Sequence, residues 1–187
     1  MKRAEWREEM AGVPAEDLVF VDEFGADIRL TRAYARAPRG ERAVGEVPRN
    51  HGKRTSVLAA LLPGGPAAPL RRLGAYDGAG VADWAREVLC PALRPGQVVV
   101  MDNASIHKGA AVREPIEAAG CRLLFLPSYS PDFNPIELAI SKLKSALRRA
   151  GARTQDALDA AIDQALSTVT PDDARAFFKH CGYSLAQ

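Results

Sequence analysis

Two short apolar runs that each end in an aspartate constrain this chain more than any other feature. Residues 18–21 read Leu-Val-Phe-Val before Asp22, and residues 98–101 read Val-Val-Val-Met before Asp102. Continuous apolar runs of this length are typical of strands that are buried on both faces. Because open α/β sheets place their functional sites at strand ends, we interpret both aspartates as site residues. Taken singly, each aspartate also fits a solvated charge or a turn residue, and it is the pair on neighbouring strands that favours a site.

The remaining hydrophobic pattern predicts a mixed α/β sheet. The even spacing of Ile28, Leu30 and Tyr34 after Gly25 predicts the second arm of a hairpin. Helical periodicity appears from Gly80 and again later in the chain. Early strands joined by short turns should be antiparallel, and later strands joined through helices should be parallel. We expect a five-stranded sheet with helices on both faces, its strands at residues 18–23, 28–34, 55–62, 98–101 and 121–126.

Residues 135–150 predict a helix with clear ends. Asn134 suits the N-cap, Pro135 the first helical position and Gly151 the C-terminal stop. Glu137 has two readings. It completes a capping box with Asn134, or it serves as a metal ligand.

A second face of this helix favours the ligand reading. Glu137, Ser141, Lys144 and Arg148 follow one another at steps of four, three and four, so they share a face. An acid followed by two cations suits a polyanion, with the acid holding metal and the cations holding phosphate oxygens. Two-metal cleavage of a phosphodiester needs such hard oxygen ligands. No His/Cys cluster, nucleotide-binding Gly-rich loop or GxSxG elbow competes.

Cations gather between Arg29 and Arg54, where eight of them accompany two acids. Two readings remain open: a solvated loop, or a segment that follows a DNA backbone. His107 and Lys108 follow Asp102 closely, and contact with a phosphate competes with a cap or loop role. The candidate DNA-contact residues are Arg36, Arg39, Arg42, Lys53, Arg54, His107, Lys108, Lys144 and Arg148.

Composition bounds the remaining possibilities. The 187 residues are enough for one domain, and an apolar fraction of 47% can form a core. Three widely spaced cysteines lack a CxxC pair, so we expect reduced thiols. No apolar run approaches the ~20 residues that span a bilayer. The charged N-terminus does not look like a secretory signal. We therefore expect a soluble cytoplasmic protein that neither associates with a membrane nor binds a small-molecule cofactor.

The segments VFVDEFG, VVVMDNASIHK and LPSYSPDFNPIELAISKLK resemble the three catalytic blocks of the mariner superfamily of DDE transposases. The bacterial insertion-sequence branch is the most similar, because 34 residues (103–136) lie between Asp102 and Glu137, as in that branch. RAYARAPRGER and the terminal FFKHCGY also look like family features.

This resemblance implies a ribonuclease H-like fold and two Mg2+ ions per site, with Mn2+ able to substitute. Asp22, Asp102 and Glu137 match the metal-binding acids, and Asn134 matches a residue with a structural role. The family cuts DNA at element ends and transfers strands into a TA-containing target. Its members act as homodimers on paired ends, which implies a nucleoid-associated bacterial protein.

Two departures from the family pattern stand out. Ile140 lies where many relatives have tryptophan. The helix-turn-helix domains that recognise element ends also have no room upstream, so we expect residues 1–16 to be a linker or remnant and residues 17–187 to be the DDE catalytic domain. A split reading frame, a truncated copy and an excised domain all fit. The alternatives to a transposase are a ribonuclease H-like nuclease that cuts without joining, and a catalytically silent DNA-binding remnant.

Overall fold

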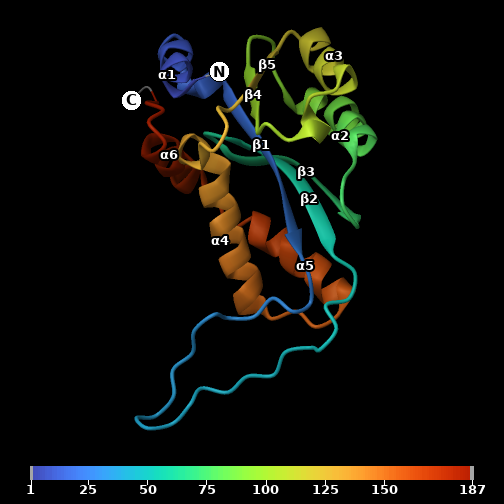
Figure 1. The fold of residues 1–187 in the computed structure, drawn as a ribbon, viewed down its shortest axis with the longest axis vertical. Helices are drawn as coiled ribbons and strands as arrows, with labels where there is room; N and C mark the ends of the chain where they lie inside the picture. Colours follow the sequence, from blue (N-terminus) through green and yellow to red (C-terminus); the bar gives the residue numbers. More distant parts are fainter. Residues whose placement is uncertain (1, 186–187) are drawn as a thin grey trace.

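A single five-stranded sheet organises the molecule (Figure 1). The computed structural model describes residues 2–185, and its strands lie in the order β3-β2-β1-β4-β5. The strands are β1 (Leu18–Ala26), β2 (Thr55–Leu62), β3 (Gly65–Leu73), β4 (Val98–Met101) and β5 (Arg122–Phe125). The α-helices are α1 (Arg3–Ala11), α2 (Gly78–Trp84), α3 (Ala110–Ala118), α4 (Pro135–Ala150), α5 (Gln155–Leu166) and α6 (Pro171–His180).

Strand directions follow the connections. β1 pairs antiparallel with β2, and β2 with β3, whereas β1–β4 and β4–β5 are parallel. The expected change from antiparallel to parallel pairing is confirmed. β1 lies at the centre of the sheet, where it borders both kinds of pair.

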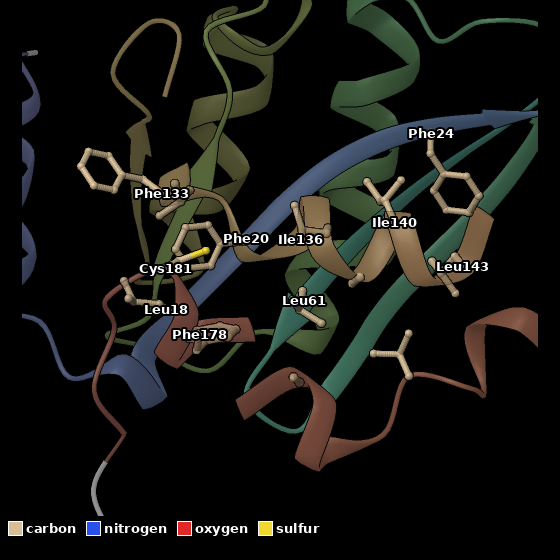
Figure 2. Close-up of a cluster of buried hydrophobic side chains, with 14 of the residues drawn as sticks. Leu18, Phe20, Phe24, Leu61, Phe133, Ile136, Ile140, Leu143, Phe178 and Cys181 are labelled. Atoms are coloured by element: carbon tan, nitrogen blue, oxygen red, sulfur yellow. The ribbon is translucent and has the colours of Figure 1, made fainter. Parts of the chain in front are cut away.

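Alternation along β1 and β4 divides the core into two layers. Leu18, Phe20 and Phe24 face the layer beneath α4, α5 and α6, where Ile136 and Ile140 of α4 pack on the sheet (Figure 2). The odd-numbered residues of β1 and β4 face a second layer with α2 and α3. Helices therefore cover both faces, as expected. Ile140 is 5% exposed and belongs to the first layer, so its position on the apolar face of α4 is a packing position.

The predicted hairpin arm at residues 28–34 is wrong. No strand forms between residues 27 and 54 in the described chain, and this segment extends away from the body (Figure 1). Tyr34 is 92% exposed, so the even spacing has no sheet face to bury it. The start of the segment is held instead by Arg153, whose guanidinium donates to the carbonyls of Ile28 and Leu30 at 2.9 and 3.1 Å.

The strand missed by the sequence pattern is β3. Pro63 and Gly64 form a two-residue turn between Leu62 and Gly65, and Gly65 takes a φ of +119°. Pro66 and a second proline at position 69 argue against a central strand. β3 tolerates both because it is the edge strand of the sheet.

Residues 3–11 form a helix that the sequence analysis did not predict. Trp6 and Met10 of α1 are 1% and 8% exposed and face the first core layer. Their spacing of four residues was the available signal, obscured by the charges around it.

Two expectations from composition can be compared with the structure. Cys90, Cys121 and Cys181 are free, with Cys90 only half-buried. None of the helices in residues 2–185 is both long and apolar enough to cross a membrane.

Candidate active site

Strand register brings Asp22 and Asp102 to neighbouring positions. β1 and β4 run parallel with Phe20 opposite Val100, and each aspartate lies two residues further along its strand. Both residues therefore continue the set that faces α4.

Asp22 lies at a crowded, largely buried position. Its Oδ1 accepts from the Glu23 backbone N–H at 2.7 Å, and its Oδ2 accepts from Asn134 Nδ2 at 3.3 Å. Burial raises its pKa to about 7, and the negative charges of Glu137 and Asp102 add to that rise. These carboxylates therefore form an anionic cluster in which a cation would be stabilised.

Glu23 points away from this cluster. It lies on the opposite side of β1, towards the layer that contains Tyr76. Burial raises the pKa of the Tyr76 phenol, and the charge of Glu23 adds to it. Asp22 and Glu23 are thus adjacent acids in different environments.

Asp102 is held by two donors on one oxygen. Its Oδ1 accepts from the Ala104 N–H at 2.9 Å and from His107 Nδ1 at 2.6 Å. The pKa of Asp102 is lowered, chiefly by the hydrogen bond to His107. Because an ionised carboxylate only accepts, Nδ1 carries the proton in this pair.

His107 itself is 2% exposed, at the end of a short 3₁₀ turn, η4 (Ser105–His107). Its Nε2 is buried without a hydrogen-bond partner among the described residues. This position does not suit the phosphate contact considered from sequence. It suits a residue that orients Asp102. The only sequence signal for this role was the position of His107 five residues after Asp102.

Glu137 is the candidate acid on helix α4. It lies in the first turn of α4, exposed to solvent, and its carboxylate makes no hydrogen bond or ion pair with described residues. The capping box of the alternative reading is absent, because the Asn134 side chain makes no cap hydrogen bond and donates to Asp22 instead. Asn134 Oδ1 remains buried without a partner. The capping reading of Glu137 therefore loses its support.

A cleft of about 390 Å³ opens beside these acids. Asp102 and Glu137 both contribute to its lining, which also includes the 126–131 segment. Within residues 2–185, no three His, Cys, Asp or Glu side chains are grouped closely enough to hold a metal ion in this arrangement. The donors are nonetheless of the right chemistry, since they are carboxylate oxygens of the kind that Mg2+ prefers.

The candidate DNA-contact cations fall into three places. Arg36, Arg39, Arg42, Lys53 and Arg54 are all exposed on the 27–54 segment. Lys108 is exposed after η4, close enough to Asp102 to help lower its pKa. Lys144 and Arg148 are half-buried along α4 and form no ion pair with any described residue.

Comparison with known proteins agrees with this architecture. A family model described as "DDE superfamily endonuclease" matches residues 17–159. The chain belongs to the DDE superfamily endonucleases. That match contains all three acids of the candidate site.

Solved structures show the same fold at low identity. The Mos1 transposase paired-end complex with left transposon end has a TM-score of 0.72 and 17% identity, covering 95% of this chain and 56% of that one. The catalytic domain of Mos1 mariner transposase has a TM-score of 0.63 and 14% identity, covering 95% and 83%. The sheet order and helices of this DDE endonuclease are therefore ribonuclease H-like. The chain spans about half the length of the full Mos1 chains, and no curated protein matches it.

Proposed function

We propose that this DDE endonuclease is the catalytic domain of a DNA transposase, which cuts DNA and joins the cut strand to a target. The observation that carries the proposal is the raised pKa of Asp22, which burial causes and to which the charges of Glu137 and Asp102 add. Carboxylate oxygens of this kind support the binding of two divalent cations. Mos1 complexes solved with Mg and with Mn add support from structural relatives.

When bound, the two ions activate an attacking water or 3′-hydroxyl and stabilise the leaving oxygen. The chain's own residues prepare for this. Because His107 and Ala104 occupy Oδ1 of Asp102, its Oδ2 stays free to face a cation. The proton on His107 Nδ1 keeps Asp102 ionised. Asn134 donates to Asp22 and orients it, and Glu137 on the first turn of α4 would supply the third carboxylate.

The partner in this proposal is DNA. The exposed arginines of residues 27–54 and the cations of α4 would neutralise phosphates on either side of the scissile bond. The 34-residue spacing from Asp102 to Glu137 supports the bacterial insertion-sequence branch. The paired-end and strand transfer complexes of Mos1 transposase support a homodimer on paired DNA ends.

The test uses two adjacent acids as a matched pair. Supercoiled plasmid is incubated with Mn2+ and the wild-type chain, Asp22→Asn or Glu23→Gln. We expect nicking by the wild type and by Glu23→Gln, and a loss of at least 100-fold in Asp22→Asn, because charge stabilisation in the transition state is a large term. Equal nicking by all three proteins would refute the site.

Joining is measured separately. A library of blunt duplexes with randomised termini is mixed with the plasmid and Mn2+, and the joined products are sequenced. Recovered junctions that share a terminal sequence support a transposase. Nicking without junctions identifies a nuclease that only cuts, and DNA binding without nicking identifies a silent remnant.

A further inference from the structure

One row of residues crosses the sheet on the face opposite the candidate acids. Gly25 of β1 pairs with Ser56 of β2, and Ser56 pairs with Arg72 of β3. Because directly paired residues of antiparallel strands point to the same face, these three form a row across the sheet. Gly25 lies three residues after Asp22, so the row faces away from α4. Leu70, in the neighbouring row of the same face, is 38% exposed, so this part of the face is open to solvent.

The guanidinium of Arg54 lies directly over Gly25. A Cβ atom placed on Gly25 would come within 1.8 Å of Arg54 Nε and 2.3 Å of its Cζ, so the guanidinium occupies the space of the missing side chain. The main chain of Arg54 is also held, since its carbonyl accepts from the Gly74 N–H at 2.8 Å. The exposed Arg54 side chain makes no hydrogen bond or ion pair with the described residues. Its N–H donors are therefore held over the sheet without a protein acceptor.

The middle of the row is a hydroxyl that also lacks a partner. Ser56 is 0% exposed, and its Oγ has no hydrogen-bond partner among residues 2–185. Buried polar groups in folded proteins are almost always hydrogen-bonded, so an unpartnered one indicates a bound group that supplies the partner.

Arg72, at the other end of the row, is oriented by an aromatic ring. Its guanidinium lies 5.2 Å from the ring centroid of Tyr76, whose hydroxyl donates to the Leu70 carbonyl at 2.9 Å. The ion pair of Arg72 with Asp77 is long, at 3.7 Å, and that carboxylate already accepts from the Gly80 N–H at 2.9 Å. Arg72 therefore keeps N–H donors for a further acceptor.

We propose that this row is a phosphate-binding site, which holds one phosphate group between Arg54 and Arg72, over the Ser56 hydroxyl. Each guanidinium offers paired N–H donors to phosphate oxygens, and the hydroxyl donates to a further oxygen. Adjacent strands lie about 4.8 Å apart, so the ends of the row are about 10 Å apart and both arginines reach its centre. Glu23 lies on the same face but forms no ion pair with either arginine in the described chain.

The ligand is a phosphate group, either of a DNA backbone or of free phosphate. The site goes beyond the proposed function, since it contains none of the three acids and lies on the other face of the sheet. A DNA phosphate bound there lies away from the scissile bond. Arg54 is thereby set apart from the other arginines of the 27–54 segment.

The decisive variant is Gly25→Ala, which changes no charge. Its added methyl group displaces the Arg54 guanidinium, and Gly25 is not among the glycines with a positive φ, so the strand accepts alanine. Ser56→Ala removes the hydroxyl and should be at least as stable as the wild type, because its Oγ has no partner to lose. Gly12→Ala is the matched control, since its added methyl meets no atom within 4 Å.

Binding of inorganic phosphate is measured by isothermal titration calorimetry in EDTA, with chloride at the same ionic strength as the reference. Binding of a blunt duplex is measured by fluorescence anisotropy in the same buffer. We expect the wild type and Gly12→Ala to bind phosphate in preference to chloride. Gly25→Ala and Ser56→Ala should each bind phosphate at least about fivefold more weakly, the effect of losing a hydrogen bond to a charged group.

A wild type that does not prefer phosphate to chloride overturns the site, and so does either variant that binds phosphate as tightly as Gly12→Ala. If Gly25→Ala melts early, Ser56→Ala decides alone. When the site is upheld, a parallel loss of duplex binding identifies the DNA backbone as the source of the phosphate, and unchanged duplex binding identifies free phosphate. Plasmid nicking by the wild type and its loss in Asp22→Asn test the proposed function separately, because Asp22 lies on the other face.

Discussion

At the scale of single residues, the two aspartates of the candidate site have few hydrogen-bond donors. Asp102 receives two donors on one oxygen, and Asp22 receives one weak side-chain donor from Asn134. The two aspartates consequently differ in electrostatics. The pKa of Asp102 is lowered by its hydrogen bond to His107, whereas burial raises that of Asp22 to about 7. Ionisation of Asp22 therefore costs more free energy in the metal-free protein than ionisation of Asp102.

This cost predicts a pH-dependent stability. The folded-state pKa of Asp22 lies above its ordinary value of 3.8, so the folded protein loses stability as pH rises from about 4 through about 7. The loss is at most about 4 kcal/mol for the rise to about 7, at about 1.4 kcal/mol per unit. Asp22→Asn should therefore melt at a higher temperature than the wild type at pH 8 in EDTA.

Thermal unfolding followed by circular dichroism checks this prediction. At pH 5, where the wild-type carboxyl is already protonated, the two proteins should melt within a few degrees of each other. A melting difference that is the same at pH 5 and pH 8 would show that the Asp22 charge does not destabilise the fold.

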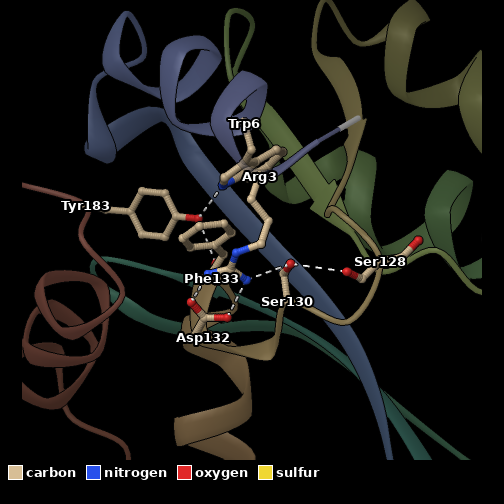
Figure 3. A network of polar contacts seen from close by, with 7 residues as sticks. All are labelled: Arg3, Trp6, Ser128, Ser130, Asp132, Phe133 and Tyr183. Atoms are coloured by element: carbon tan, nitrogen blue, oxygen red, sulfur yellow. Dashed lines mark hydrogen bonds and ion pairs between the residues drawn. The ribbon is translucent and has the colours of Figure 1, made fainter.

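At the scale of elements, α1 and the segment after α6 support the turn that precedes α4. Trp6 Nε1 of α1 donates to the Tyr183 hydroxyl at 3.2 Å, and that hydroxyl donates to the Phe133 carbonyl at 2.7 Å (Figure 3). Phe133 lies in the 3₁₀ turn η5 (Pro131–Phe133), immediately before Asn134 and α4. α1 and the segment after α6 thus meet over the residues that introduce Glu137.

Removal of one oxygen should weaken this junction. Tyr183→Phe leaves the indole N–H and the Phe133 carbonyl without their partner, which costs about 1–3 kcal/mol when such groups are buried. Urea unfolding of the variant should show that loss. Tyr34→Phe deletes the same atom from a residue that is 92% exposed and should change nothing. A Tyr183→Phe variant as stable as Tyr34→Phe would mean that water replaces the missing hydroxyl.

At the scale of the whole molecule, the 27–54 segment extends far beyond the globular body and bears eight exposed lysine and arginine side chains (Figure 1). If it follows a DNA backbone, its arginines release counterions on binding. Replacement of Arg36, Arg39 and Arg42 by alanine should reduce the slope of log affinity against log salt by about 3, roughly one per phosphate contact.

Anisotropy titrations with a blunt duplex at several salt concentrations measure that slope. The matched control replaces Arg86, Arg113 and Arg175, each of which already pairs with an acid three or four residues away. These changes should leave the slope almost unaltered. Equal effects of the two triple variants would assign the salt dependence to net charge and not to the segment.

Much of this architecture was readable from local sequence patterns, because its strands are short, apolar and well bounded. β2 and α4 coincide with the predicted ranges, since Pro63-Gly64, Asn134 and Gly151 mark their ends. β3 and α1 were missed for a different reason. Their identity depends on the edge of the sheet and on a buried Trp6, which only the tertiary fold supplies.

The sequence predicted the acids of the candidate site but not the residues that hold them in place. Strand ends and spacing singled out Asp22, Asp102 and Glu137, whose metal-binding role remains a prediction. The contact from Asn134 to Asp22 joins residues 112 positions apart, and no local pattern encodes it. The same holds for the hydrogen bond from the Arg3 guanidinium to Ser130 Oγ, which joins residues 127 positions apart.

The edge-on packing of Phe20 against Phe178, with ring centroids 5.4 Å apart, and its contact with Tyr183 at 5.0 Å have a temporal consequence. β1 leaves the ribosome well before α6, yet the ring two residues before Asp22 is covered by α6 and the segment after it. The carboxylates can therefore reach their final arrangement only after residues 171–183 have been synthesised. A growing chain would carry all three acids without the means to hold them together.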